Sequence, residues 1–186
     1  HGCLVGSEMC IRDRYISATH SICEDIEKRR ILLENLQDEE NKDGDHPKLW
    51  KNFAKALGAD EKEIENVKLD WFTKDMIENF FDQARKSYAE GLASLYTYER
   101  QIPEIAETKI QGLKKFYGVN SKEGLEFFEA HKSADVIHRA ECEKLLDGLS
   151  KEEQKKAETS SLLTARYLWN FLSGMTSKHK LQTIAA

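Results

Sequence analysis

The chain has 186 residues, of which 28 are basic and 33 are acidic, with a net charge of −5. This length fits one globular domain with a sizeable core. The interspersed charges give no reason to expect nucleic acid or an anionic membrane as a partner, and no apolar run approaches the roughly 20 residues that span a bilayer. Only two prolines among abundant Glu, Lys, Leu and Ala predict an all-α fold.

The first fourteen residues, HGCLVGSEMCIRDR, lack a hydrophobic period and resemble the translation of a sequencing adapter that recurs at the ends of metagenomic gene fragments. We therefore exclude residues 1–14 from the fold as a non-native artefact, and we assign a single domain to residues 15–186. Cys23 and Cys142 are then the cysteines of the domain, and no CxxC motif is present. This pattern predicts a reduced, cytoplasmic protein.

The first helices follow from the spacing of apolar residues and from capping residues. A long first helix is expected over 15–41, and it runs into the polar segment DEENKDGD (38–45), whose Gly44 and Asp/Asn content break it. A second helix opens at His46-Pro47, because proline is tolerated in a first turn, and it ends near Gly58. A short acidic helix is expected over 60–67 with Asp60 as its N-cap.

The next segments are also helical. Thr73 is expected to cap a long helix that runs through Arg100. Pro103 interrupts that helix by removing a backbone donor, and a further helix over 104–117 ends at Gly118.

Two long helices complete the chain. Ser121 begins a helix that continues to about Leu146, and Ser150 with Glu153 matches a capping box that opens the last helix. The last helix is expected to run through Ala157, Leu162, Tyr167, Trp169 and Phe171.

The segment FFEAHKSADVIHRAE (127–141) carries a set of metal-ligand residue types. His131, Asp135 and His138 are spaced i, i+4 and i+7, so a helix returns them to one face. Two imidazoles and a carboxylate on one face suit iron, manganese or zinc. The alternative is a solvated polar stripe on an exposed helix.

Three residues in other helical stretches supply matching ligand types. Glu39 and His46 are separated by a turn that lets both approach a common point. Glu99 continues the apolar stripe over 88–95, and an ionised carboxylate on a buried face is costly unless it is paired or bound to metal. The alternatives are a water-facing acid for Glu39, a cap-like residue for His46 and a surface kink for Glu99.

Carboxylates and imidazoles without thiolates suit redox-active iron or manganese better than structural zinc. Two metals sharing a carboxylate could bind and reduce dioxygen. The ligand types therefore favour an oxygenase or oxidase.

Three segments carry a family resemblance: NLQDEE…HPKLW (35–50), SLYTYERQIPEIAETKIQGLKKFYG (94–118) and EAHKSADVIH (129–138). They resemble the chlamydial proteins that associate with death domains and their bacterial relatives. These proteins belong to the haem-oxygenase-like dinuclear-metal oxygenases, beside pyrroloquinoline-quinone synthase and thiaminase II. The resemblance covers nearly all of residues 15–172. It implies a haem-oxygenase-like helical bundle whose metal ligands are Glu39, His46, Glu99, His131, Asp135 and His138.

The resemblance also implies a role in folate metabolism, the synthesis of para-aminobenzoate. The aromatic ring would come from a tyrosine of the protein itself, cut out with dioxygen at two metal ions, iron or iron plus manganese. Lys109 aligns with a lysine proposed as the source of the amino group, although by sequence alone it is an ordinary exposed helix lysine. An electron donor is needed, and a homodimer is expected by analogy.

The family begins with about two further helices before the position of Tyr15, and the sacrificed tyrosine lies there. We therefore expect this chain to hold most of its metal ligands, to expose an apolar groove and to be inactive. We assign Tyr98 to core packing and Cys142 to a small buried apolar role.

Three other functions remain open. The same metal scaffold could oxidise a separate small substrate. A suitable tyrosine in the N-terminal helices would argue against this function. A metal-free enzyme resembling pyrroloquinoline-quinone synthase or thiaminase II would leave the acidic ligands as buried charge. A non-enzymatic interaction protein would give no reason for six converging ligands.

Overall fold

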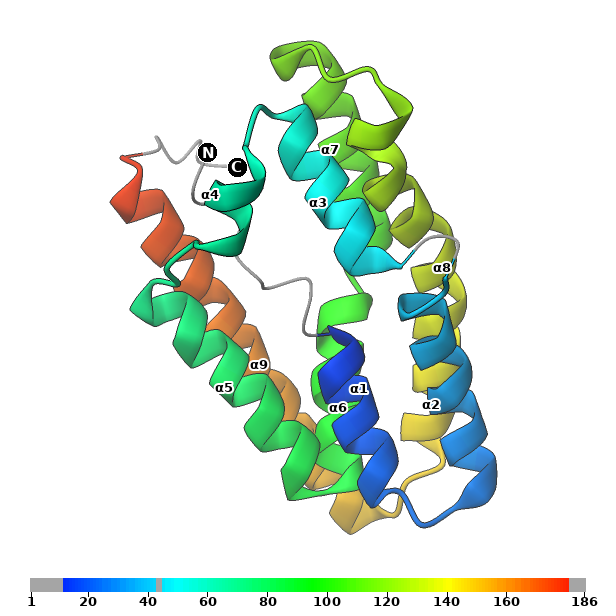
Figure 1. The fold of residues 1–186 in the computed structure, drawn as a ribbon. Helices are drawn as coiled ribbons and strands as arrows, with labels where there is room; N and C mark the ends of the chain where they lie inside the picture. The colour runs from blue at the N-terminus through cyan, green and yellow to red at the C-terminus, as the bar shows by residue number, and fades with distance from the viewer. Residues whose placement is uncertain (1–11, 43–44, 181–186) are drawn as a thin grey trace.

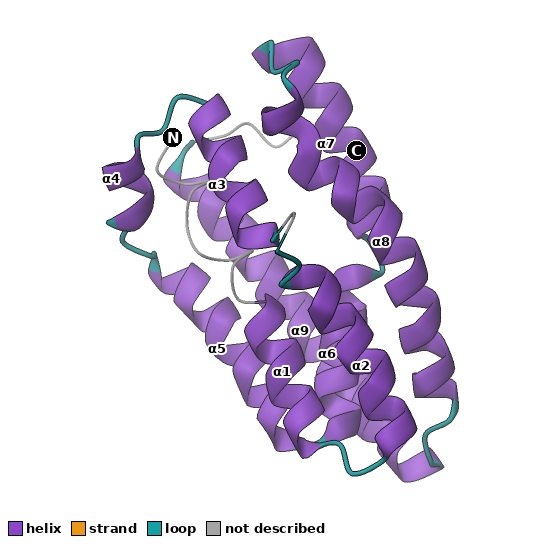
Figure 2. Cartoon of the chain, turned by 45° about the vertical axis from the view of Figure 1, so that its right-hand side comes forward, coloured by secondary structure: helices purple, strands orange, loops and turns teal. Residues whose placement is uncertain are grey.

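The computed structural model describes residues 12–42 and 45–180, which consist of helices and connecting loops without a strand (Figures 1 and 2). This confirms the all-α prediction. None of the described helices is both long and apolar enough to cross a membrane. The helices are α1 (Arg12–Ile22), α2 (Ile26–Glu39), α3 (His46–Ala56), α4 (Glu61–Glu65), α5 (Trp71–Lys86), α6 (Tyr88–Glu99), α7 (Ile102–Tyr117), α8 (Lys122–Asp147) and α9 (Lys151–Lys178).

Helix α6 lies at the centre of the bundle and packs against α1, α5, α8 and α9 (Figure 1). It can do so because its first two turns carry small residues, among them Ala89, Gly91 and Ala93. A Cβ atom on Gly91 would lie 2.6 Å from Oγ1 of Thr19 in α1 and 3.0 Å from Cα of Ala84 in α5. The absence of a side chain at Gly91 therefore lets three helices approach one another closely.

Two apolar clusters are joined by α8, which contributes to both. The first lies where α1, α2, α5, α6 and α8 meet, and its buried residues are Tyr15, Ile16, Leu32, Met76, Phe80, Ala84, Leu92, Leu95, Cys142 and Leu145. The second joins α3, α7 and α8, and its buried residues are Leu49, Trp50, Phe53, Ala106, Ile110, Leu113, Val119, Leu125, Phe127 and Phe128. The stretch of α8 between Phe128 and Cys142 thus runs from one cluster to the other.

Most predicted helix ends are confirmed by cap geometry. Helix α3 begins at His46, α4 has an Asp60 capping box, and α9 has the predicted capping box of Ser150 and Glu153. Gly118 ends α7 in the left-handed conformation, with a φ of 68° that favours glycine.

Two long predicted helices are each divided in the structure. The first is broken into α1 and α2 because Asp25 accepts hydrogen bonds from the backbone N–H groups of Glu27 and Lys28. The second is broken into α5 and α6 by Ser87, which accepts from the N–H of Glu90. Thr73 lies inside α5 and is not its cap. The apolar period continues across both breaks, so periodicity alone concealed them.

Helix α9 runs through the five predicted residues, but its buried side consists mainly of small residues. Leu162 and Trp169 are 61% and 72% exposed, and the buried residues of the helix are Ala157, Ser160 and Thr164. The hydroxyl of Ser160 donates to the carbonyl of Glu90 at 2.8 Å, and the hydroxyls of Thr164 and Ser94 lie 2.9 Å apart. Small polar side chains face α6 because the two helices are too close for large ones.

The segment excluded from the fold contributes to α1. Residues 1–11 lie outside the described residues, but Arg12, Asp13 and Arg14 form the first turn of that helix. The side chain of Arg12 is buried in the centre of the bundle. An adapter origin for residues 1–14 stays a prediction.

We predict that Gly91→Ala destabilises the protein by about 1–3 kcal/mol, because the added methyl group overpacks the contact between α1, α5 and α6. Gly112→Ala is the matched control, since a Cβ there meets no atom within 4 Å. It should stabilise α7 by about 0.5–1 kcal/mol. Urea unfolding of both variants measures the difference, and equal stabilities would contradict the close packing at Gly91.

Candidate metal centre

The six predicted ligands come from four helices and are all buried. Glu39 ends α2, His46 begins α3, Glu99 ends α6, and α8 supplies the other three. None of the six is more than 5% exposed. The alternatives that placed these residues on solvent-facing surfaces are therefore wrong.

The structure gathers the six residues into two groups of three. Glu39, His46 and His131 form the first triad, and Glu99, Asp135 and His138 form the second. Within each triad, one potential ligand atom per residue lies within 4.8 Å of the others. Helix α8 contributes to both triads, so its i+4 step from His131 to Asp135 connects them.

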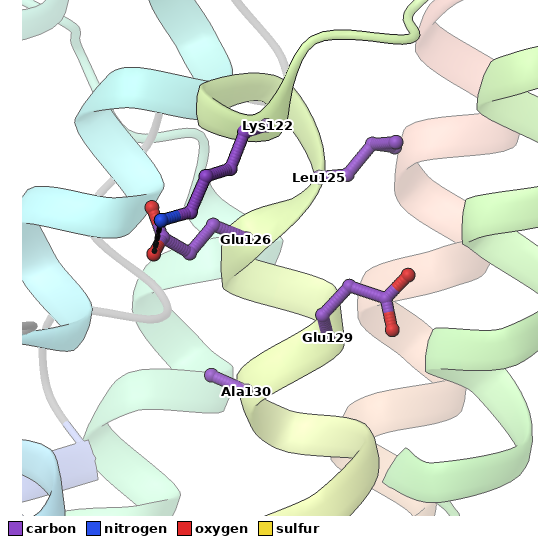
Figure 3. A pocket seen from close by; sticks show the side chains of 5 residues that line it. All are labelled: Lys122, Leu125, Glu126, Glu129 and Ala130. Carbon is purple, nitrogen blue, oxygen red and sulfur yellow. Dashed lines mark ion pairs between the residues drawn. The ribbon is translucent and has the colours of Figure 1, made fainter.

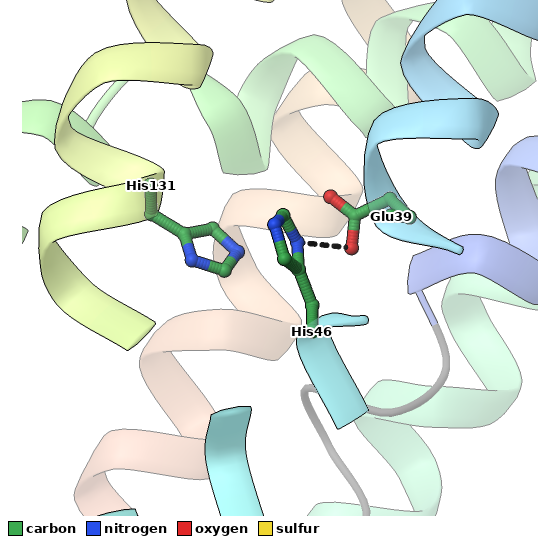
Figure 4. A group of neighbouring side chains, drawn as sticks. All are labelled: Glu39, His46 and His131. Carbon is green, nitrogen blue, oxygen red and sulfur yellow. Dashed lines mark ion pairs between the residues drawn. The ribbon is translucent and has the colours of Figure 1, made fainter. Parts of the chain in front are cut away.

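In the first triad, the His46 ring lies between the Glu39 carboxylate and the His131 ring (Figure 4). Nδ1 of His46 is 2.8 Å from Oε2 of Glu39, and the two imidazole centroids are 4.2 Å apart. Nδ1 of His131 is 2.7 Å from the carbonyl oxygen of Phe127. Since a carbonyl only accepts, Nδ1 carries the proton and Nε2 keeps its lone pair for a ligand. Burial lowers the pKa of His131 to about 4, which keeps the imidazole neutral.

In the second triad, neighbouring polar groups hold each ligand in place. Nε2 of His138 lies 3.0 Å from Oδ2 of Asp38, so Nδ1 faces the triad, 3.4 Å from Oδ1 of Asp135. Glu99 accepts a hydrogen bond from Nδ2 of Asn35 at 2.8 Å and one from the thiol of Cys142 at 3.5 Å. Such contacts orient metal ligands and tune their basicity.

The guanidinium of Arg12 lies between the two triads. Its Nη2 atom is 2.7 Å from Oε1 of Glu99 and 2.5 Å from Oδ1 of Asp135, and its Nε atom is 3.1 Å from Oε1 of Glu39. Burial raises the pKa of Glu99, whereas Arg12 overcomes the effect of burial on Asp135 and holds the pKa of that carboxyl well below its usual range. The single positive charge of Arg12 therefore does not neutralise the three buried carboxylates of Glu39, Glu99 and Asp135.

The donor set fits divalent metal ions. Within the described part of the chain, Oε1 of Glu39, Nδ1 of His46 and Nε of Arg12 are buried and have no hydrogen bond of good geometry, although Arg12 Nε lies 3.1 Å from Oε1 of Glu39 and His46 Nδ1 lies 2.8 Å from Oε2 of Glu39. These polar atoms are close to one another but are not aligned as donor and acceptor. Buried polar atoms are normally satisfied, and coordination by Glu39 and His46 would satisfy two of these three.

Sequence reasoning missed Asn35 and Asp38, which precede Glu39 on α2 and contact the predicted ligands. Cys142 follows His138 by one helical turn, so its spacing places it near the site, although we assigned it a small buried apolar role. The prediction that Cys142 is buried is confirmed, and its thiol also contacts Glu99. No sequence signal pointed to Arg12, because its segment was excluded.

Two tyrosines lie close to the triads. Tyr15 stacks on Phe80 with a centroid distance of 4.9 Å, and its buried hydroxyl has no hydrogen-bond partner among the described residues. Burial raises its pKa well above the usual range, and the charges of Arg12 and Glu99 also act on it. Tyr98 packs against the first apolar cluster, as predicted, and its ring centroid is 5.9 Å from the guanidinium carbon of Arg12.

Lys109 is not part of this cluster. Its side chain is exposed on α7, and no hydrogen bond or ion pair in the described part of the chain joins it to the six buried ligands. A role for Lys109 as the amino donor stays a prediction.

Surface hollows occur outside the cluster. One on α8 is lined by Lys122, Leu125, Glu126, Glu129 and Ala130, with a 3.5 Å ion pair between Lys122 and Glu126 (Figure 3). It contains none of the predicted ligands. Another on α2 includes Asp38, the hydrogen-bond partner of His138. The expected apolar groove stays a prediction.

We predict that Asp38→Ala lowers metal affinity about 10- to 100-fold, because His138 loses the carboxylate that fixes its ring. Glu34→Ala is the control, since Glu34 is an exposed acid on the same helix. Competition with a metal-chelating dye under anaerobic conditions measures both affinities. Equal affinities would show that Asp38 does not orient His138.

Comparison with known proteins gives consistent results. Residues 10–169 match the profile of a family described as iron-containing redox enzymes. The chain is 39% identical over 160 residues to a 4-aminobenzoate synthase from Chlamydia trachomatis, covering 86% of this chain and 69% of the relative. It is 40% identical over 161 residues to one from Chlamydia pneumoniae, covering 86% and 71%. A 4-aminobenzoate synthase from Nitrosomonas europaea is 39% identical over 156 residues, covering 81% and 63%. With its all-helical fold and two ligand triads, the chain belongs to the haem-oxygenase-like family of iron-containing redox enzymes.

Proposed function

We propose that this protein makes 4-aminobenzoate with dioxygen at a dinuclear centre of iron, or of iron and manganese. The observation that carries the proposal is the convergence of six buried ligands in two triads. They occur in a chain that is 39–40% identical to proteins named 4-aminobenzoate synthase.

In this proposal each triad holds one metal ion. Glu39, His46 and His131 hold the first, and Glu99, Asp135 and His138 hold the second. Bound iron would supply the electrons that reduce dioxygen, and a separate electron donor would restore them. The thiol of Cys142 donates a hydrogen bond to Glu99 at 3.5 Å, and Cys142 belongs to neither triad. The predicted ligand set therefore has oxygen and nitrogen atoms only, as iron and manganese prefer.

The source of the aromatic ring is the second part of the proposal. The family resemblance implies a tyrosine of the protein itself, in helices before Tyr15. Among the described residues, Tyr15 offers a buried phenol whose hydroxyl has no hydrogen-bond partner, close enough to the second triad for the charge of Glu99 to act on it. Tyr15 is therefore the first residue to test within this chain, and Tyr98 is the second.

The competing function is oxidation of a separate small substrate at the same centre. The two functions use identical metal ligands and differ only in where the ring of the product comes from. An isotope experiment therefore distinguishes them, whereas metal content does not.

We predict that the chain binds two metal ions when it is loaded anaerobically with iron and manganese. His131→Ala removes a ligand of the first triad and Glu99→Ala removes one of the second, so both should lower the metal content by at least one ion per chain. His179→Ala is the control, because that histidine is exposed at the end of α9. Mass spectrometry of metal content measures the result, and a wild-type chain without stoichiometric metal would overturn the proposal.

We further predict that protein labelled with ring-deuterated tyrosine yields deuterated 4-aminobenzoate after addition of iron, a reductant and dioxygen. Unlabelled product would favour a separate substrate. Loss of product in Tyr15→Phe but not in Tyr98→Phe would place the ring source at Tyr15, and Lys109→Arg tests the amino donor. Metal binding without any product would contradict the proposed function for this chain.

A further inference from the structure

The guanidinium of Arg12 is not explained by the proposed function. It is 2% exposed and reaches carboxylates of both triads, 2.7 Å from Glu99, 2.5 Å from Asp135 and 3.1 Å from Glu39. Its Nη2 atom also lies 3.5 Å from Nδ1 of His138. A single side chain thus contacts four of the six predicted ligands.

We propose that Arg12 is an internal cation that competes with divalent metals for these carboxylates, so that metal loading expels its side chain from the centre. This inference rests on the proposed metal site. It adds a regulatory element to that site, because the affinity of the chain for metal depends on how readily Arg12 leaves.

Guanidinium and metal exclude one another for steric reasons. Bonds between a metal such as zinc and a carboxylate oxygen are about 2.0–2.2 Å long. The contacts of Arg12 with Glu99, Asp135 and Glu39 span 2.5–3.2 Å. A metal bound to these oxygens on the side that faces Arg12 would therefore overlap with the guanidinium.

The charges favour metal over arginine. Arg12 brings one positive charge to the carboxylates of Glu39, Glu99 and Asp135, whereas two divalent ions would bring four. Arginine stays protonated at any pH at which the protein is folded, so it cannot become neutral in place. Its side chain must move away before both metals can bind.

The position of Arg12 in the fold permits this movement. Arg12 is the first residue of α1, and the first turn of a helix lacks acceptors for its own N–H groups and opens more easily than the interior. Tyr15, Ile16 and Thr19 are buried and anchor the rest of the helix. The first turn can therefore release Arg12 while the rest of the bundle stays folded.

The first test compares metal affinities of the full chain and two variants, with iron(II) or manganese(II) in anaerobic equilibrium dialysis. Arg12→Gln should raise the affinity at least 10-fold, because it removes the competing charge. Arg14→Gln is the matched control, since Arg14 lies on the same helix but is exposed, with its guanidinium 5.3 Å from the ring centroid of Phe81. Equal affinities for wild type and Arg12→Gln would overturn this inference and leave the proposed function intact. Absence of metal from all three proteins would overturn both.

The second test uses the wild-type chain. This is an advantage because Arg12→Gln leaves three buried carboxylates without a cation in the metal-free protein, which destabilises the fold. Phenylglyoxal modifies accessible arginines, and mass spectrometry maps the modified residue. Arg12 should react at least 10-fold more slowly than Arg14 without metal, and its rate should rise when manganese(II) is added. An Arg12 that stays protected in a chain holding two metal ions would contradict the inference.

Discussion

The burial of three carboxylates in the middle of a helical bundle is the constraint on which the rest of this structure depends. Glu39, Glu99 and Asp135 are each no more than 1% exposed, and an ionised carboxylate at such a site is stable only next to positive charge and hydrogen-bond donors. Asn35, Arg12 and Cys142 supply donors, and the imidazoles are placed where metal ligands would be. The centre is thus built to hold cations.

Helix packing creates this buried position. Gly91 and the small residues beside it allow α6 to lie among α1, α5 and α9, and this placement carries Glu99 at the end of α6 into the interior. Helix α8 connects two apolar clusters, and its polar stretch from His131 to His138 lies between them. Apolar packing on both sides keeps water from the triads, which strengthens every electrostatic interaction there.

Arg12 connects the first turn of α1 to the chemistry of the centre. Its guanidinium gives the carboxylates of Glu39, Glu99 and Asp135 one positive charge, which is less than two divalent metal ions would bring. Under the inference made above, Arg12 therefore weakens metal binding by the wild-type chain but does not abolish it.

The sequence by itself determined most helix ends and the helical face shared by the predicted ligands. Caps such as Asp60, Ser121 and Ser150 act locally, and the i, i+4, i+7 spacing of His131, Asp135 and His138 is a property of one helix. It did not reveal the breaks at Asp25 and Ser87, where the apolar period continues across a cap. Only the tertiary structure decided how the ligands divide into two triads, that Asp38 supports His138, and that Arg12 lies between the triads. These contacts join residues up to 126 positions apart, and local sequence carries no information about such distances.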